Sequence, residues 1–163
     1  MTDPLVLRPI READLDAVRR LQADSFTALG GDMHSPAQIA AHVAEVMAPD
    51  YAGELLSNNI LVAEAPDGRL VATAGWCRVP DDPAVARLRK VFVAPDRAGQ
   101  GLGRRMVEAA ETAARAAGFR RFRVRANANA EAFYARLGYR PVERGEMPMA
   151  AGVALPTVIM VKG

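Results

Sequence analysis

Hydrophobic residues recur with two different periods along the chain, and the first third follows mostly the helical one. Apolar positions in residues 13–29 return every three or four residues with charges between them, which predicts a helix that Gly30 and Gly31 end. A second helix is predicted to begin at residues 35–38, where Ser-Pro-Ala-Gln has the order typical of a helix start. Residues 5–9 form a short predicted strand before both helices.

The rest of the chain alternates between strand and helix patterns. Residues 51–59 have no clear period and fit a short helix and a turn. Strands are predicted at residues 60–64, 70–76, 84–93, 121–126, 139–147 and 155–161, and helices from 102 and from about 130. With no linker or internal repeat, this order predicts one α/β or α+β domain over residues 1–163, in which about four helices flank a mixed sheet of about seven strands.

The helix from residue 102 is the one whose faces the sequence assigns in most detail. Its buried stripe is predicted to consist of Leu102, Met106, Ala110, Ala113 and Ala117. Glu111 and Arg115 are four residues apart, and we expect them to pair on the exposed side of this helix.

Composition narrows the functions open to such a domain. Half of the 163 residues are hydrophobic and a quarter are charged, which is typical of a globular protein. No apolar run approaches the length of a membrane helix, and the first residues lack a signal-peptide pattern. We therefore expect a cytoplasmic protein without a membrane partner. One cysteine and two histidines offer little to a disulfide or a metal site, so no metal is expected.

The distribution of charge argues against a nucleic-acid partner. The chain has 21 basic and 19 acidic residues, a net charge of only +2. Arginines gather in residues 115–125, but Phe122 and Val124 alternate with some of them, as in a half-exposed strand. A solvated strand face explains the run better than a nucleic-acid site does.

A glycine-rich turn, Gly99-x-Gly101-x-Gly103, lies between a predicted strand and a predicted helix. Glycines allow close approach of a ligand to the backbone, and the N–H groups at a helix start attract anions such as a pyrophosphate. The spacing is neither the dinucleotide fingerprint nor a P-loop. Taken alone, it is equally consistent with a tight turn that needs glycine for conformational reasons only.

Two sequence blocks give this turn a context. Val91-Phe92-Val93-x-Pro95 leads into the turn, and Asn127-x-x-Ala130-x-x-Phe133-Tyr134-x-x-x-Gly138-Tyr139 follows later. Together, in this order and at this separation, the blocks resemble the GCN5-related N-acetyltransferase (GNAT) superfamily. The order of elements is similar along almost the whole chain. The resemblance implies a mostly antiparallel sheet with a splayed strand pair at the cofactor site.

The resemblance also implies a function and a set of site residues. It implies transfer of an acetyl group from acetyl-CoA to a primary amine, by direct attack through a tetrahedral intermediate. The residues matching the cofactor-binding positions are Val91, Phe92, Val93, Gly99, Gln100, Gly101, Gly103, Arg104 and Asn127. Tyr134 matches the tyrosine that protonates the departing thiolate. Core packing for Tyr134, and a strand-end or helix-cap position for Asn127, are the alternative interpretations.

The chain departs from the family pattern at two places. Ala98 stands where Arg or Gln is common, and residues 86–90 contain no carboxylate where many members have a Glu. The general base is therefore open between a water relay and six side chains: His34, His42, Tyr51, Glu54, Asp81 and Asp82. The missing Glu also leaves a non-catalytic acyl-CoA-binding or sensor domain as the alternative function.

The acceptor is not readable from the sequence beyond its class, a small-molecule or peptide amine. Arg87 and Arg89 share one face of the strand before the turn. They are either an ordinary exposed pair or a site that selects a carboxylate or phosphate on the acceptor. The expected assembly is a monomer or a homodimer.

Overall fold

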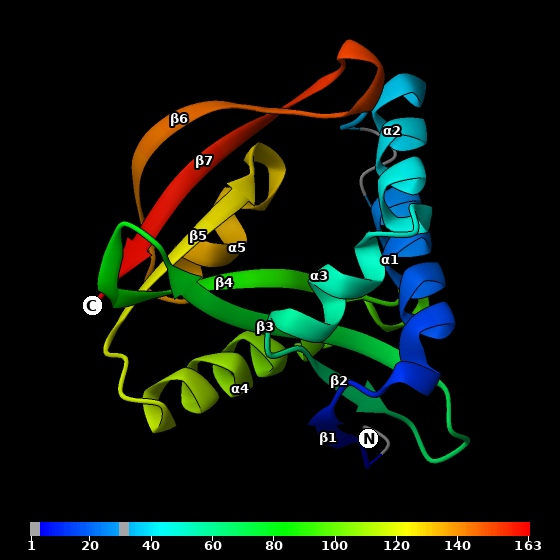
Figure 1. The fold of residues 1–163 in the computed structure, drawn as a ribbon, viewed down its shortest axis with the longest axis horizontal. Coiled ribbons are helices and arrows are strands. Elements are labelled where there is room, and N and C mark those ends of the chain that lie inside the picture. Colours follow the sequence, from blue (N-terminus) through cyan, green and yellow to red (C-terminus); the bar gives the residue numbers. More distant parts are fainter. Residues whose placement is uncertain (1–3, 30–32) are drawn as a thin grey trace.

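A seven-stranded sheet and five α-helices make up the part of the chain described by the computed structural model, residues 4–29 and 33–163 (Figure 1). The strands are β1 (Val6–Pro9), β2 (Leu61–Glu64), β3 (Leu70–Val79), β4 (Asp82–Val93), β5 (Arg121–Asn127), β6 (Arg140–Pro148) and β7 (Ala154–Lys162). The helices are α1 (Leu15–Leu29), α2 (Pro36–Met47), α3 (Tyr51–Ser57), α4 (Leu102–Ala116) and α5 (Glu131–Arg136).

The strand order is β1-β2-β3-β4-β5-β7-β6, and every neighbouring pair is antiparallel except β4 and β5. This confirms the predicted mixed, mostly antiparallel sheet. The fifth helix, α3, occupies the segment whose period was unclear. The predicted end of α1 at Gly30 and Gly31 lies outside the described residues.

The start of α2 is where the sequence predicts it, and it has the two hydrogen bonds of a capping box. The Ser35 hydroxyl accepts a hydrogen bond from the Gln38 backbone N–H at 3.1 Å, and the Gln38 side chain accepts one from the Ser35 N–H at 2.8 Å. Two of the N–H groups that a helix start leaves unpaired are thus satisfied. No helix within the described residues has the length and apolar character needed to cross a bilayer.

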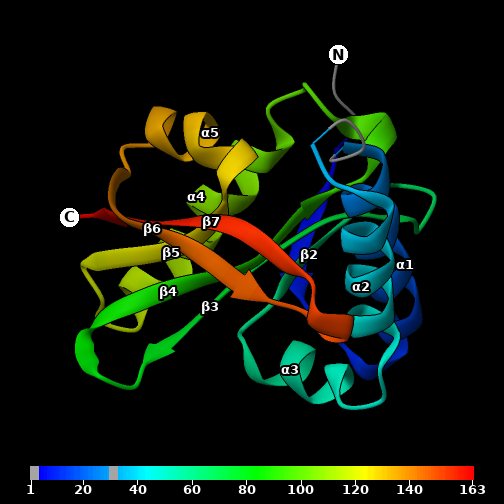
Figure 2. The same ribbon diagram turned by 90° about the horizontal axis from the view of Figure 1, so that it is seen from above.

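Two hydrophobic clusters lie on opposite faces of the sheet, because adjacent strand residues such as Val62 and Ala63 belong to different clusters. One cluster joins α4 to strands β3, β4, β5 and β7. The other joins α1, α2 and α3 to the start of the sheet. Figure 2 shows α4 and α5 on one side of the sheet and α3 on the other, with α1 and α2 beside each other.

The β6–β7 hairpin reaches across to α2 (Figure 1). The Gln38 side-chain amide donates a hydrogen bond to the Ala154 carbonyl at 2.9 Å, which ties the start of α2 to the start of β7. The start of α2 and the start of β7, more than a hundred residues apart in the sequence, are therefore held side by side.

The predicted faces of α4 are wrong in their second half. The buried positions are Leu102, Met106, Val107, Ala110, Glu111 and Ala114. Glu111 is only 2% exposed, and it accepts hydrogen bonds from the Tyr139 hydroxyl at 2.7 Å and the Lys162 ammonium at 3.0 Å. It makes no surface pair with Arg115.

Candidate functional site

The sheet splits between β4 and β5. These strands pair only where residues 85–87 lie beside residues 121–123, although β4 continues to Val93 and β5 to Asn127. Beyond the split, β4 keeps its pairing with β3, and β5 keeps its pairing with β7. The predicted splayed strand pair is therefore present, and its last residues have sheet partners on one side only.

A cavity of about 210 Å³ fills this split. Leu88 and Arg89 are consecutive on β4, and Val124 and Arg125 are consecutive on β5, yet all four line the cavity. Consecutive strand residues point to opposite faces of a sheet. The cavity therefore passes through the sheet and opens toward both faces.

Lys90 lies in a β-bulge at the wall of this cavity. One residue separates Thr73 from Gly75 on β3, whereas two separate their partners Arg89 and Phe92 on β4. Lys90 has the left-handed backbone conformation, with φ of 57°. Such bulges bend a strand and redirect its backbone groups.

A buried chain of hydrogen bonds holds the bulge. The Thr73 hydroxyl donates to the Lys90 carbonyl at 2.7 Å and accepts from the Gln22 amide at 3.2 Å. The Tyr51 hydroxyl donates to the side-chain oxygen of Gln22. Both Gln22 and Thr73 are fully buried. Through Thr73 of β3, helices α1 and α3 thereby fix the backbone of β4 at the bulge.

The glycine turn adjoins the split at the end of β4. A second cavity, of about 490 Å³, is lined by Val93, by the turn and by Phe133 of α5. The backbone N–H groups of residues 99–104 donate no hydrogen bond within the described part of the chain. Unpaired N–H groups at the start of a 15-residue helix form a donor set suited to a phosphate or pyrophosphate.

Two glycines give the turn its shape. Gly99 and Gly101 have φ of 75° and 78°, and a Cβ atom at either position would point into open space. Gly103 has a packing role instead, because a Cβ there would lie 3.2 Å from two carbons of the Phe133 ring. The turn is therefore open toward a ligand and closely packed against α5.

Most of the predicted site residues come together around the two cavities. Val91, Phe92, Asn127 and Tyr134 line the split cavity. Val93, Gly99, Gly101, Gly103 and Arg104 line the turn cavity. Gln100 lines neither; its side-chain amide lies 3.4 Å from the Asp96 carbonyl. Asn127 ends β5 and occupies the N-cap position of the 3₁₀ turn that follows, but its side chain makes no capping hydrogen bond there.

Tyr134 is buried and faces the split cavity from α5. Its ring makes edge contacts with Phe133 and Tyr139, with centroids 4.9 and 5.7 Å away. Its hydroxyl makes no hydrogen bond to any described residue. Burial raises the pKa of the Tyr134 phenol above its usual value, so the hydroxyl keeps its proton at neutral pH.

The structure separates the six side chains that the sequence left open as bases. His42 and Tyr51 line the split cavity. Glu54 is paired with Lys90 at 3.2 Å, and His34 stacks on Phe26. Asp81 lies in the turn between β3 and β4, Asp82 is the first residue of β4, and both lie close to arginines of β5.

Neither of the two cavity-lining candidates is a strong base. The Tyr51 hydroxyl donates a hydrogen bond to the side-chain oxygen of Gln22, and burial raises the pKa of the Tyr51 phenol. Burial, with smaller effects of Lys90 and His34, lowers the pKa of His42 to about 4. Its Nδ1 atom is buried without a hydrogen-bond partner among the described residues.

Glu45 is a site residue that the sequence reasoning missed. It projects from α2, is exposed, and is the only carboxylate among the described residues that line the split cavity. Nothing in the pattern of α2 distinguishes Glu45 from a solvated charge, because its role depends on where α2 packs. Among the described residues, no group of three His, Cys, Asp or Glu side chains could hold a metal ion.

Comparison with known proteins agrees with this arrangement. The family model of the acetyltransferase (GNAT) domain matches residues 57–141, more than half of the chain. The chain therefore belongs to the GNAT acetyltransferase family. No protein with a curated description matches the sequence.

Solved structures show the same fold. A GCN5-related N-acetyltransferase from Rhodopseudomonas palustris has 25% identity and a TM-score of 0.87, covering 100% of this chain and 98% of the other. The PaiA N-acetyltransferase from Thermoplasma acidophilum, solved in complex with coenzyme A, has 17% identity and a TM-score of 0.80, covering 98% of each chain. An acyl-CoA N-acyltransferase from Pseudomonas aeruginosa has 18% identity and a TM-score of 0.67, covering 99% and 100%.

Proposed function

We propose that this protein is an acetyl-CoA-dependent N-acetyltransferase that acts on a primary amine. The observation that carries the proposal is the cavity through the split sheet, which adjoins unpaired backbone N–H groups at one end and a buried tyrosine on its wall. Such a passage lets two substrates meet from opposite faces of the sheet. Membership of the GNAT family agrees with it.

The residues fit the co-substrate by their donor chemistry. Residues 91–93 of β4 have no strand partner on the split side and can pair with an extended pantetheine arm as a strand would. The N–H groups of residues 99–104 and the helix dipole of α4 receive the pyrophosphate. Asn127 lines the same cavity as Val91 and Phe92, and its side chain is therefore placed to contact the pantetheine arm.

The protein's own groups then serve the reaction. Acetyl-CoA supplies a thioester whose carbonyl carbon an amine can attack. A backbone N–H on the split side of β4 stabilises the negative charge that develops on the carbonyl oxygen. The Tyr134 hydroxyl, which is protonated and makes no hydrogen bond to any described residue, donates its proton to the departing sulfur.

The amine must lose a proton to react. Glu45 lines the cavity and carries a carboxylate, whereas the lowered pKa of His42 makes its imidazole a weak base. We therefore assign Glu45, acting directly or through a water, as the proton acceptor. This side chain takes the place of the carboxylate that residues 86–90 of β4 lack.

The substitution Gly101→Asp tests the co-substrate site. It places a carboxylate against the unpaired N–H groups, and should abolish most of the thermal stabilisation by acetyl-CoA, which is about 2.7 kcal/mol at 100 times Kd. Gly68→Asp is the matched control, because Gly68 also has positive φ and open space but lies in the β2–β3 turn.

Calorimetry measures acetyl-CoA binding, and thiol release with a panel of primary amines measures transfer. Binding without release with any amine would favour the non-catalytic acyl-CoA sensor instead. No binding to the unaltered protein would contradict both functions.

A further inference from the structure

A third cavity, of about 440 Å³, opens on the acceptor side of the split and is rich in arginine. Five arginines line it, namely Arg78, Arg87, Arg89, Arg123 and Arg125. Asp81 is the only acidic side chain among the described residues that line it, and it lies 3.9 Å from Arg123. The cavity is therefore strongly positive, although the chain as a whole has a net charge of only +2.

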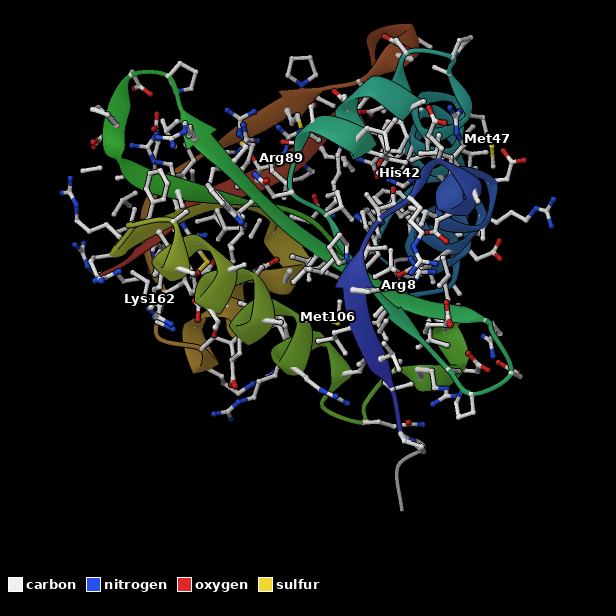
Figure 3. All side chains as sticks on the ribbon, turned by 60° about the horizontal axis from the view of Figure 1, so that its bottom comes forward. Arg8, His42, Met47, Arg89, Met106 and Lys162 are labelled. Carbon is white, nitrogen blue, oxygen red and sulfur yellow. The ribbon has the colours of Figure 1, made fainter. Side chains whose placement is uncertain are left out.

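The strand register explains why the charges gather. Arg87 on β4 lies between Cys77 on β3 and Arg123 on β5, and directly paired residues share a face. Arg89 and Arg125 are each two residues further along the same strands, on the same face. The opposite face of β4 and β5 is apolar and packs in the core cluster that contains α4. In Figure 3, Arg89 and His42 lie on one side of the sheet and Met106 of α4 on the other.

Four of these arginines have no counter-ion among the described residues, and one of the four, Arg78, lies over the Phe119 ring with its Cζ 5.1 Å from the ring centroid. Arg87, Arg89 and Arg125 make no hydrogen bond or ion pair with any described residue. Arg87 is also half-buried, and burial lowers the pKa of its guanidinium, with Arg89 and Arg125 lowering it further. Holding like charges together without an anion is unfavourable, so the site is suited to receive one.

The same three arginines line the split cavity as well as the arginine cavity. An anion bound to them would lie on the face opposite the core that holds α4, away from the glycine turn. It would therefore not compete with the pyrophosphate. It would lie beside the path by which an acceptor amine reaches the split.

We infer that Arg87, Arg89 and Arg125 form a subsite for an anionic group of the acceptor, so that the substrate is a small amine that also carries a carboxylate or a phosphate. Guanidinium groups bind both oxyanions through paired hydrogen bonds. The inference rests on the proposed acetyl transfer and names its substrate class. Glu45, across the same cavity, would then face the amino end of such an acceptor.

Matched acceptor pairs test the inference. 4-Aminobutanoate is compared with 4-aminobutanamide, and aminoethyl phosphate with ethanolamine. The anionic member of each pair should have the higher kcat/KM by about 10- to 100-fold, as expected for a hydrogen bond to a charged group. Arg87→Gln and Arg125→Gln should collapse this ratio toward one. Arg20→Gln, an exposed arginine of α1, should keep it.

A second measurement does not depend on turnover. At low ionic strength, inorganic phosphate in the presence of saturating CoA should raise the melting temperature of the unaltered protein and of Arg20→Gln. It should not raise that of Arg87→Gln or Arg125→Gln. A phosphate effect that survives both substitutions would overturn the arginine site.

The two proposals fail in different ways. Equal acetylation of anionic and neutral amines would overturn the acceptor subsite and leave the proposed function intact. Acetylation of no amine at all would overturn the proposed function and the acceptor assignment with it. The phosphate measurement would still decide whether the arginines bind an anion.

Discussion

At the scale of single residues, the split cavity sets an acid and a base in different environments. Tyr134 lies on the wall formed by α5, buried and protonated, with no partner for its hydroxyl among the described residues. Glu45 lies on the wall formed by α2 and is exposed. The groups proposed to give and to take a proton therefore come from opposite sides of the passage.

Tyr134→Phe removes only the hydroxyl, so the ring contacts with Phe133 and Tyr139 should remain. We expect acetyl-CoA affinity to stay nearly unchanged, while kcat falls by about 10²- to 10⁴-fold, the usual contribution of a positioned acid. Calorimetry and steady-state turnover on a working acceptor measure the two effects.

Glu45→Gln is the companion variant for this measurement. Its loss of rate should shrink as pH approaches the pKa of the acceptor amine, because a neutral amine needs no base. The defect of Tyr134→Phe should not follow that pattern. Full turnover in Tyr134→Phe would show that water or another group protonates the thiolate.

At the scale of elements, the bulge in β4 depends on α1 and α3, through a chain of hydrogen bonds that reaches it by way of β3. Thr73 is the link, because its hydroxyl bonds both the Lys90 carbonyl and the Gln22 amide. The bulge sets where the N–H groups of the split side of β4 point. Thr73 is thus a positioning residue, and its hydroxyl is the part that matters.

Thr73→Val keeps the shape of the side chain but leaves the Lys90 carbonyl and the Gln22 amide without this partner. We expect kcat to fall about tenfold or more, since small misplacements in an active site are costly. The Kd for acetyl-CoA should change little, and the free energy of unfolding should fall by about 1–3 kcal/mol. Thr73→Ser, which restores the hydroxyl, should recover kcat. A loss of stability with normal kcat would mean that the hydrogen bonds of Thr73 support only the fold.

The sequence predicted the elements better than their faces. The capping box at Ser35 and the order of elements along the chain are local or periodic signals, and both are observed. The inward position of Glu111 was missed because α4 is rich in alanine, which is compatible with either face of a helix. Its partner Lys162 comes from β7, so no local pattern reveals the pair.

The same limit applies to the site. The glycine turn and Tyr134 are carried by contiguous motifs, and the structure brings their surroundings together. Glu45 and Arg125 acquire their places only when α2 and β5 pack beside β4. Residues that belong to a site through tertiary packing alone leave no trace in the spacing of one sequence.

At the scale of the whole molecule, the two sides of the sheet divide the work. The side of α4 and α5 carries the turn and Tyr134, and the side of α1, α2 and α3 carries His42, Glu45 and the bulge support. The β6–β7 hairpin joins the sides by its bond to α2. The side of α1, α2 and α3 also buries a titratable group, His42, so the stability of the fold depends on the protonation of that group.

His42 makes this coupling measurable. It is 8% exposed, stacks on Phe26 with centroids 4.0 Å apart, and has its pKa lowered to about 4 by burial, Lys90 and His34. In the unfolded chain a histidine gains its proton near pH 6.5, so between these values the unfolded state binds more protons. Acid must therefore destabilise the fold, and we expect about 2–3 kcal/mol from His42 between pH 7.5 and 4.5.

Urea unfolding of the unaltered protein and of His42→Phe at both pH values isolates this contribution. Arginine partners lower the pKa of carboxyl groups such as those of Asp14 and Asp96, and protonation of these groups in acid also destabilises the folded protein. These carboxyl groups are common to both proteins. The difference between the two proteins should therefore shift by the His42 amount, in favour of His42→Phe at pH 4.5. His34→Gln should keep most of the acid sensitivity, because His34 is less buried. An unchanged difference at the two pH values would show that His42 is accessible to protons in the folded state and that α2 does not seal it.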